Sequence, residues 1–209
     1  MKVVSVNISD ARQVEVEGRT VATGIYKEPV RGRVCVTRRT LDGDRQVDQS
    51  VHGGPDKAVY AYPHEHYATW AREEQRDDFT FGQFGENLTT EGLLENTVHI
   101  GDRFRAGTAV LEVTQPRVPC YKLGIKMGDP GFPKRFLASK RCGWYFRVIE
   151  EGEVAADDPV ERVSEDPERI SIEDLYTLRY FDRADRETLQ RALALDALSG
   201  DWRRELAEL

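Results

Sequence analysis

The sequence is poor in cysteine and lacks long hydrophobic runs. Its 209 residues include three cysteines, Cys35, Cys120 and Cys142. Three cysteines are too few for a disulfide framework and fit a reducing compartment. No apolar run approaches the roughly 20 residues that a membrane-spanning helix needs, and the N-terminus turns polar too soon for a signal peptide. We therefore expect a cytoplasmic protein that does not bind membranes.

Several well-known catalytic and metal-binding motifs are also missing. Without a CxxC or HExxH pattern, a structural zinc site, a cysteine-ligated iron–sulfur cluster and a zinc protease site are disfavoured. Without GxGxxG, GxxxxGK[ST] or GxSxG, the usual nucleotide phosphate loops and the hydrolase nucleophile turn are disfavoured. A Cys–His enzyme stays open, because the sequence does not tell whether His52 or His99 lies beside Cys120.

Charge is distributed unevenly along the chain. Residues 1–149 carry 22 Lys and Arg against 19 Asp and Glu, whereas residues 150–209 carry 8 against 18. No long basic arm exists, so we expect no nucleic-acid partner. One window differs, because from Arg117 to Arg147 there are eight basic residues and a single acid, Asp129. This window indicates either a site for an anionic ligand or a solvated basic face.

The hydrophobic pattern predicts a mainly β fold with some α. Short alternating or β-branched segments between Gly and Pro turns predict strands, and Pro63 is expected to open a helix with Tyr67 and Trp70 facing inward. These strands predict a β-barrel over residues 1–165. The acidic stretch 150–168 is expected to be a linker. A three-helix unit follows over residues 166–209, with a capping box from Ser171 to Asp174. The predicted strands cover residues 3–8, 14–16, 20–26, 30–37, 58–62, 97–100, 103–106, 109–114 and 144–149.

Cys120 is the first candidate for chemistry. It follows a strand that ends at Thr114 and a loop stiffened by Pro116 and Pro119. Arg117 and Lys122 flank it, and nearby positive charge favours the thiolate. A thiolate on a rigid loop suits a soft metal or a nucleophilic role. The alternative is a buried, inert cysteine, which is a common fate of a lone thiol.

Two further segments are candidates for ligand binding. In the first, Gly53 and Gly54 would let backbone N–H groups approach a ligand, with His52 and Lys57 as flanking donors. The alternative for these glycines is a tight turn that needs positive φ. In the second, the sequence Phe-Gly-Glu-Asn-Leu-Thr ending at Thr89 contains Asn87, whose amide would face either the backbone or a ligand.

Taken in order, these segments resemble the MOSC domain, named for the C-terminal part of molybdenum-cofactor sulfurases, and more closely its YiiM-like branch. The resemblance spans residues 27 to 150 and extends into the helical tail. The segments that carry it are Lys27-Glu28-Pro29-Val30, Gly43-Asp44-Arg45-Gln46-Val47-Asp48, His52-Gly53-Gly54-Pro55-Asp56-Lys57-Ala58-Val59-Tyr60, Phe84-Gly85-Glu86-Asn87-Leu88-Thr89, Ile100-Gly101-Asp102, Thr114-Gln115-Pro116-Arg117-Val118-Pro119-Cys120 and Gly143-Trp144-Tyr145-Phe146-Arg147.

The resemblance implies a MOSC-type β-barrel that binds the molybdenum cofactor, a pterin with a dithiolene and a phosphate. Cys120 matches the cysteine that ligates molybdenum, and Asn87 matches a motif near the cofactor. Charge and motif membership add further cofactor-binding candidates. These further candidates are Lys57, Arg117, Arg147, Gly53 and Gly54. A proton-transfer role is assigned to His52 on the same basis.

The activity that the resemblance implies is reduction of N-hydroxylated compounds, such as 6-hydroxylaminopurine, by removal of the oxygen atom. Because the chain has no flavin or iron–sulfur motif, a separate reductase would supply electrons, and the acidic tail is a candidate docking surface. The alternative is a carrier of the cofactor, or of sulfur as a persulfide on Cys120. The sequence does not fix the oligomeric state, and a homodimer is one assembly it allows.

Overall fold

The computed structural model of the chain describes residues 1–16, 18–47 and 53–209. An eight-stranded sheet forms its centre, in the order β12-β8-β9-β10-β6-β7-β1-β4. Neighbouring strands are antiparallel except for β6 and β7, which run parallel. These strands are β1 (Lys2–Ile8), β4 (Glu28–Pro29), β6 (Val59–Pro63), β7 (Leu88–Glu91), β8 (Arg103–Ala106), β9 (Ala109–Pro116), β10 (Trp144–Glu150) and β12 (Val160–Ser164).

The sheet curls until its far strands meet, but its ladders do not form a continuous closed barrel. Three backbone hydrogen bonds join the start of β1 to the segment that enters β12. They run from Val3 N to Asp158 O (2.9 Å), from Asp157 N to Val3 O (2.8 Å) and from Val160 N to Met1 O (3.0 Å). The predicted mainly β class is confirmed. In place of the predicted closed β-barrel, the structure has a curled, open sheet whose two sides are joined by these three hydrogen bonds.

Two smaller sheets complete the β structure. The hairpin of β2 (Arg12–Val16) and β3 (Arg19–Thr23) projects from one end, and β5 (Val34–Val36) pairs with β11 (Gly152–Val154). The strand predicted over 30–37 is thus wrong in extent, since β4 and β5 are separate. The linker predicted over 150–168 is also wrong, because it contains β11 and β12. Edge strands often carry charged side chains, and this charge gave β12 the composition of a linker.

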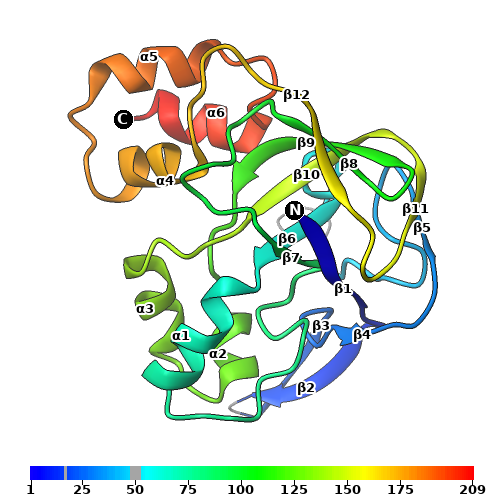
Figure 1. Ribbon diagram of the computed structural model, residues 1–209. Helices are drawn as coiled ribbons and strands as arrows, with labels where there is room; N and C mark the ends of the chain where they lie inside the picture. Colours follow the sequence, from blue (N-terminus) through cyan, green and yellow to red (C-terminus); the bar gives the residue numbers. More distant parts are fainter. Residues whose placement is uncertain (17, 48–52) are drawn as a thin grey trace.

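The first helical group covers one end of the sheet. It consists of α1 (Glu65–Glu73), α2 (Tyr121–Met127) and α3 (Phe132–Ala138), which lie together in Figure 1. Tyr67 and Trp70 are buried as predicted, and Trp70 stacks on Phe136 with ring centroids 5.8 Å apart. Pro63 ends β6 rather than opening α1, whose N-cap is His64. Helices α2 and α3 were not predicted, because each is seven residues long and lies beside prolines.

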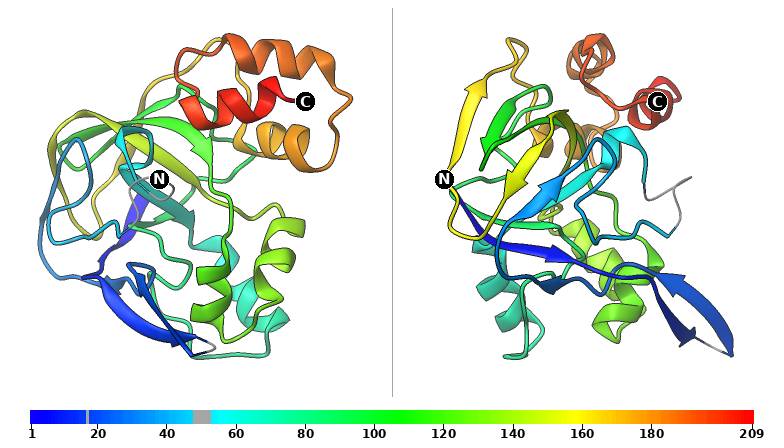
Figure 2. Two further views of the ribbon diagram at one scale, coloured as in Figure 1. Left: turned by 180° about the vertical axis from the view of Figure 1, so that it is seen from behind. Right: turned by 90° about the vertical axis from the view of Figure 1, so that its right-hand side faces the viewer.

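The second helical group forms the predicted C-terminal unit. It consists of α4 (Ile172–Tyr180), α5 (Arg186–Ala194) and α6 (Gly200–Ala207), and Figure 2 shows it at the opposite end from the β2–β3 hairpin. The capping box between Ser171 and Asp174 is present. Residues 97–100, predicted as a strand, form turns in which His99 bridges Ser171. Within the described residues, no helix is long and apolar enough to span a membrane.

Candidate functional site

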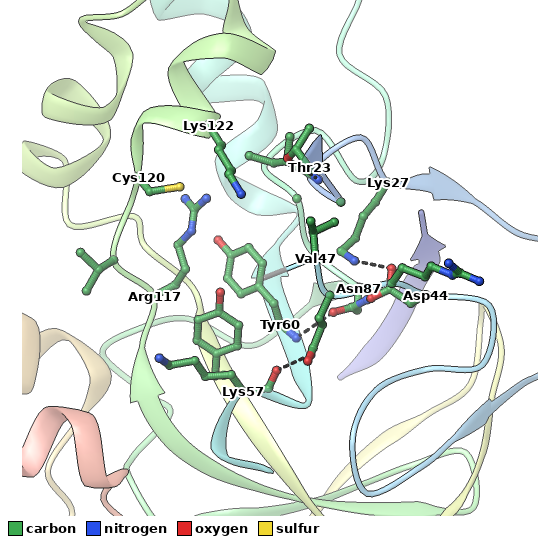
Figure 3. Close-up of a pocket in the computed structure, with 17 residues that line it drawn as sticks. Thr23, Lys27, Asp44, Val47, Lys57, Tyr60, Asn87, Arg117, Cys120 and Lys122 are labelled. Carbon is green, nitrogen blue, oxygen red and sulfur yellow. Dashed lines mark hydrogen bonds and ion pairs between the residues drawn. The ribbon is translucent and has the colours of Figure 1, made fainter. Parts of the chain in front are cut away.

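A pocket opens where the end of the β2–β3 hairpin, residues 44–47 and the loop after β9 meet (Figure 3). Its described lining is rich in positive charge, with five basic side chains against one acidic one, Asp44. Such an excess of one sign raises the local concentration of oppositely charged ligands. The pocket therefore favours an anion. The five basic residues are Lys27, Arg45, Lys57, Arg117 and Lys122.

Cys120 lines this pocket and is the N-cap residue of α2. Its backbone is extended (φ −120°, ψ 172°), which is typical of the residue that precedes the first turn of a helix. The residue is partly exposed and forms no disulfide. Figure 3 shows its sulfur facing the side of the pocket to which the Arg117 guanidinium and the Lys122 ammonium also point. The thiol is thus presented to the pocket in a positively charged setting, which favours thiolate chemistry.

Arg117 is a buried cation, only 5 % exposed. Its guanidinium lies over the rings of Tyr60 (5.3 Å to the centroid) and Phe136 (5.0 Å). Its Nη1 atom is buried and has no hydrogen-bond partner among the described residues. A buried polar atom without a partner is rare in native proteins. An anionic group bound in the pocket, such as a phosphate, would supply that partner.

Asn87 lines the pocket, but its amide is occupied within the protein. Its Oδ1 accepts from Tyr60 N (3.1 Å), and its Nδ2 donates to Asp44 Oδ2 (3.0 Å) and Asn7 O (3.3 Å). Asp44 also pairs with the Lys27 ammonium. Burial lowers the pKa of Lys27, while the Asp44 carboxylate opposes that shift. Asn87 therefore positions the Asp44–Lys27 pair at the pocket wall.

The structure does not bring all the predicted residues together. Cys120, Lys57, Asn87 and Arg117 line one pocket, whereas Gly53 and Gly54 are not among its described lining residues. Gly54 has φ 96° and precedes the short helix η1 (Pro55–Lys57), so its role is the positive-φ turn. His52 lies outside the described residues.

Arg147 is also absent from the described lining of the pocket. Its guanidinium pairs with Asp56 Oδ1 (2.7 Å) and Glu112 Oε1 (3.1 Å) and donates to Ala197 O (3.3 Å). It links β10 to η1, β9 and the helical unit. The contacts of the Arg147 guanidinium are thus made within the protein, and they give this charged residue a structural role.

Several pocket residues had not been singled out as site residues. Lys27 and Asp44 occur in the segments that carry the family resemblance, but a buried ion pair between them cannot be read from two separate turns. Tyr60 and Tyr145 had the pattern of ordinary strand residues. Burial raises the pKa of both phenols, with Arg117 opposing the shift in each case. Both phenols therefore keep their protons at neutral pH.

The donor set suits a cofactor with its own metal ligands better than a bare metal ion. Among the described residues, no group of three His, Cys, Asp or Glu could hold a metal. A single thiol beside a basic, partly buried cradle instead matches a soft metal carried by an anionic organic group. The molybdenum cofactor, with its dithiolene and phosphate, has these features. In this pocket Cys120 would hold the metal, and Arg117 and Lys122 would face the negative charge.

Comparison with known proteins identifies the family of the chain. Residues 48–161 match the MOSC domain model, and residues 170–209 match the YiiM-like 3-alpha helix domain. The chain is 40 % identical over 201 residues to the uncharacterized protein YflK of Bacillus subtilis, covering 96 % of this chain and 90 % of that one. It is 39 % identical over 192 residues to the protein YiiM of Escherichia coli, covering 91 % of this chain and 84 % of that one.

Solved structures show the same fold. The crystal structure of YiiM from Geobacillus stearothermophilus superposes with a TM-score of 0.85 at 35 % identity, covering 99 % of this chain and 97 % of that one. A further relative from Gibberella moniliformis, named a reductase, is 35 % identical over 146 residues, which are 68 % of this chain and 26 % of that protein. The chain therefore belongs to the MOSC-domain family, in the branch that carries the YiiM-like three-helix domain.

Proposed function

We propose that the protein is a molybdenum-cofactor-dependent reductase of N-hydroxylated compounds. The observation that carries the proposal is the convergence of the Cys120 thiol and the unpartnered Nη1 of Arg117 on one basic pocket. The relative from Gibberella moniliformis that is named a reductase supports the same reaction class.

The overall reaction converts R–NH–OH, two electrons and two protons into R–NH₂ and water. When bound, the cofactor would supply the two-electron removal of oxygen from nitrogen. A separate reductase provides the electrons. The acidic C-terminal unit remains our candidate for its docking surface.

The chain's own residues bind and orient. Arg117, fixed between Tyr60 and Phe136, presents its free Nη1 to an anion. Lys27 is held by Asp44, which Asn87 in turn positions. The phenol of Tyr145 lines the pocket and holds a proton at Oη, because burial raises its pKa. It can therefore donate a hydrogen bond to a bound ligand at neutral pH.

Turnover of 6-hydroxylaminopurine with reduced viologen dye tests the proposal. The protein is produced in a host that makes the cofactor, and dye oxidation is followed at matched protein concentrations. We expect turnover in the wild type and its loss in Cys120→Ala. Cys35→Ser is the control, because Cys35 is exposed on β5 and does not line the pocket. Unchanged turnover in Cys120→Ala would refute the ligand role of this thiol.

A carrier is the alternative that the same experiment separates. Wild-type protein that contains molybdenum but does not oxidise the dye with any N-hydroxylated substrate would contradict the reductase. A mass increase of one sulfur atom on the Cys120 peptide would then assign a persulfide carrier role.

A further inference from the structure

A second cavity, which we call the interdomain groove, lies between the MOSC domain and the helical unit. Its helical wall consists of Arg179 on α4 and Asp201, Trp202 and Glu205 on α6. The wall is fastened to the MOSC domain at its edge, since Lys57 Nζ lies 2.6 Å from Asp201 Oδ2 and Ser199 N donates to Thr114 O (3.2 Å). The groove is therefore shaped by both units.

The groove and the basic pocket share a border. Lys57, Val118, Cys120 and Tyr145 line both cavities. A ligand in the groove would thus approach Cys120 from the side of the helical unit, while a ligand in the pocket reaches it from the side of the β2–β3 hairpin. Two molecules bound in the two cavities would therefore meet at Cys120.

The two cavities differ in charge. The described lining of the pocket has five basic residues and one acidic residue. The groove has two of each, with Lys57 and Arg179 balanced by Asp201 and Glu205. Arg179 pairs with Glu205, as Lys57 does with Asp201. The pocket therefore attracts an anion, whereas the groove offers no net charge and suits a neutral ligand.

The groove also contains an unused acceptor. Gln115 on β9 lines it and is 3 % exposed, and its buried Oε1 atom has no hydrogen-bond partner among the described residues. Its Nε2 donates to Pro116 O at a long 3.5 Å. A buried amide oxygen without a partner calls for an N–H or O–H donor from a ligand. Trp202, Pro119 and Tyr145 provide flat or rigid apolar surface beside it.

We propose that the interdomain groove binds the ring of a neutral, flat N-hydroxylated heteroaromatic base, with Gln115 accepting from an N–H of that base. This inference rests on the proposed function and adds to it the place of the substrate and the residues that select it. The ring would lie beside Trp202, and its N–OH group would point to Cys120. The helical unit then determines specificity.

The first test measures binding of adenine, the product of 6-hydroxylaminopurine reduction, by calorimetry on the cofactor-loaded protein. We expect Gln115→Leu to weaken adenine binding about tenfold, the effect of one lost hydrogen bond to a buried group. The unfolding midpoint of this variant should stay close to that of the wild type, because Oε1 forms no hydrogen bond to the described protein and the substitution removes only the long bond from Nε2 to Pro116 O. Equal adenine affinity in wild type and Gln115→Leu would overturn the proposal, whether or not the protein turns over a substrate.

A second variant guards against misfolding of the first. Glu205→Gln removes the negative charge that pairs with Arg179 in the wall of the groove. Glu208→Gln is the control, because Glu208 is exposed, directly follows α6 and does not line the groove. We expect a several-fold rise in KM for 6-hydroxylaminopurine in Glu205→Gln and no change in Glu208→Gln.

Hydroxylamine, which has no ring, serves as the comparison substrate. Gln115→Leu and Glu205→Gln should raise the KM for hydroxylamine less than the KM for 6-hydroxylaminopurine, because hydroxylamine has no ring to bind in the groove. Equal effects on both substrates would contradict a ring-binding groove. If cofactor-loaded wild-type protein turned over neither substrate, the proposed function would be contradicted. Adenine binding would still decide whether the groove binds the ring.

Discussion

Lys57 Nζ lies 2.6 Å from Asp201 Oδ2, and this ion pair joins the MOSC domain to the first turn of α6. Hydrogen bonding to Lys57 is the largest cause of the lowered pKa of Asp201. The lysine side chain is 11 % exposed, whereas the aspartate side chain is 41 % exposed. The pair is therefore partly screened by solvent. It nevertheless sets the edge of the groove on which our account of specificity depends.

Asp201→Asn should destabilise the protein modestly, by at most about 1 kcal/mol at pH 7. Because the folded-state pKa of Asp201 is lowered, its contribution is present above the unfolded-state pKa and is lost as the pH falls through the folded-state pKa. Urea unfolding from pH 7 to pH 3 should thus show the curves of wild type and variant converging at the acidic end. A constant difference over this range would contradict the ion pair's contribution.

Arg117→Met should separate stability from cofactor binding. The buried guanidinium has an unpartnered nitrogen, so replacing it with an apolar side chain of similar length should change the stability of the cofactor-free protein by less than about 2 kcal/mol, and in either direction. Cofactor retention should fall, because the anion loses its buried partner. Unfolding in urea and molybdenum content, measured on the same preparations, check both statements. Full molybdenum content in this variant would exclude Arg117 from the cofactor site.

Asn87→Ala should behave in the opposite way, since its amide is used by the protein. The substitution removes the hydrogen bonds to Tyr60 N and Asp44 Oδ2, leaving Asp44 Oδ2 only the bond from the Thr40 hydroxyl (3.2 Å), and we expect a loss of about 2–4 kcal/mol in the free energy of unfolding. Asn87→Asp preserves the shape but places a carboxylate next to Asp44, so it should be no less harmful. Near-native unfolding midpoints for both variants would show that this network does not support the pocket.

Lys126 predicts a change of stability at alkaline pH. Burial lowers its pKa to about 8, and its ammonium donates to Ile25 O (3.0 Å) and Gly82 O. Below that value the buried charge costs stability. The cost is relieved as the pH rises from about 8 towards the ordinary lysine pKa of about 10.4, where the unfolded chain holds more protons than the folded one.

The difference in unfolding free energy between wild type and Lys126→Met, measured from pH 7 to 10.5, isolates this group from the other residues that titrate. It should shift in favour of the wild type by up to about 3 kcal/mol across the range. Parallel stability curves would contradict the buried charge.

Local patterns predicted the elements that have strong local signals. The buried face of α1, the capping box of α4 and most strands of the sheet follow from hydrophobic period and capping chemistry. Helices α2 and α3 were not predicted, because seven residues give too few turns for a hydrophobic period to show. Strand β12 was not predicted, because its exposed charged side chains match those of a linker.

The sequence predicted pocket-lining residues that stand out individually, and it missed pairs formed by residues far apart in the chain. Cys120 and Arg117, singled out as a thiol and a basic residue near each other in sequence, both line the pocket, and their roles toward a cofactor stay predictions. The Lys27–Asp44 pair joins two turns, and Gln115 becomes notable only because its buried Oε1 lacks a partner. Arg147 was a predicted cofactor-binding residue, but its guanidinium forms ion pairs with Asp56 and Glu112 inside the protein. Such pairings depend on tertiary contacts that no local pattern encodes.

The molybdenum-to-protein ratio tests the central claim most directly. It is measured by elemental mass spectrometry on wild type, Cys120→Ser and Cys142→Ser, all produced in a host that makes the cofactor. Cys142 is fully buried and serves as the matched control. We expect a ratio near one in wild type and Cys142→Ser, and its collapse in Cys120→Ser. An undiminished ratio in Cys120→Ser would contradict the assignment of this thiol as the metal ligand.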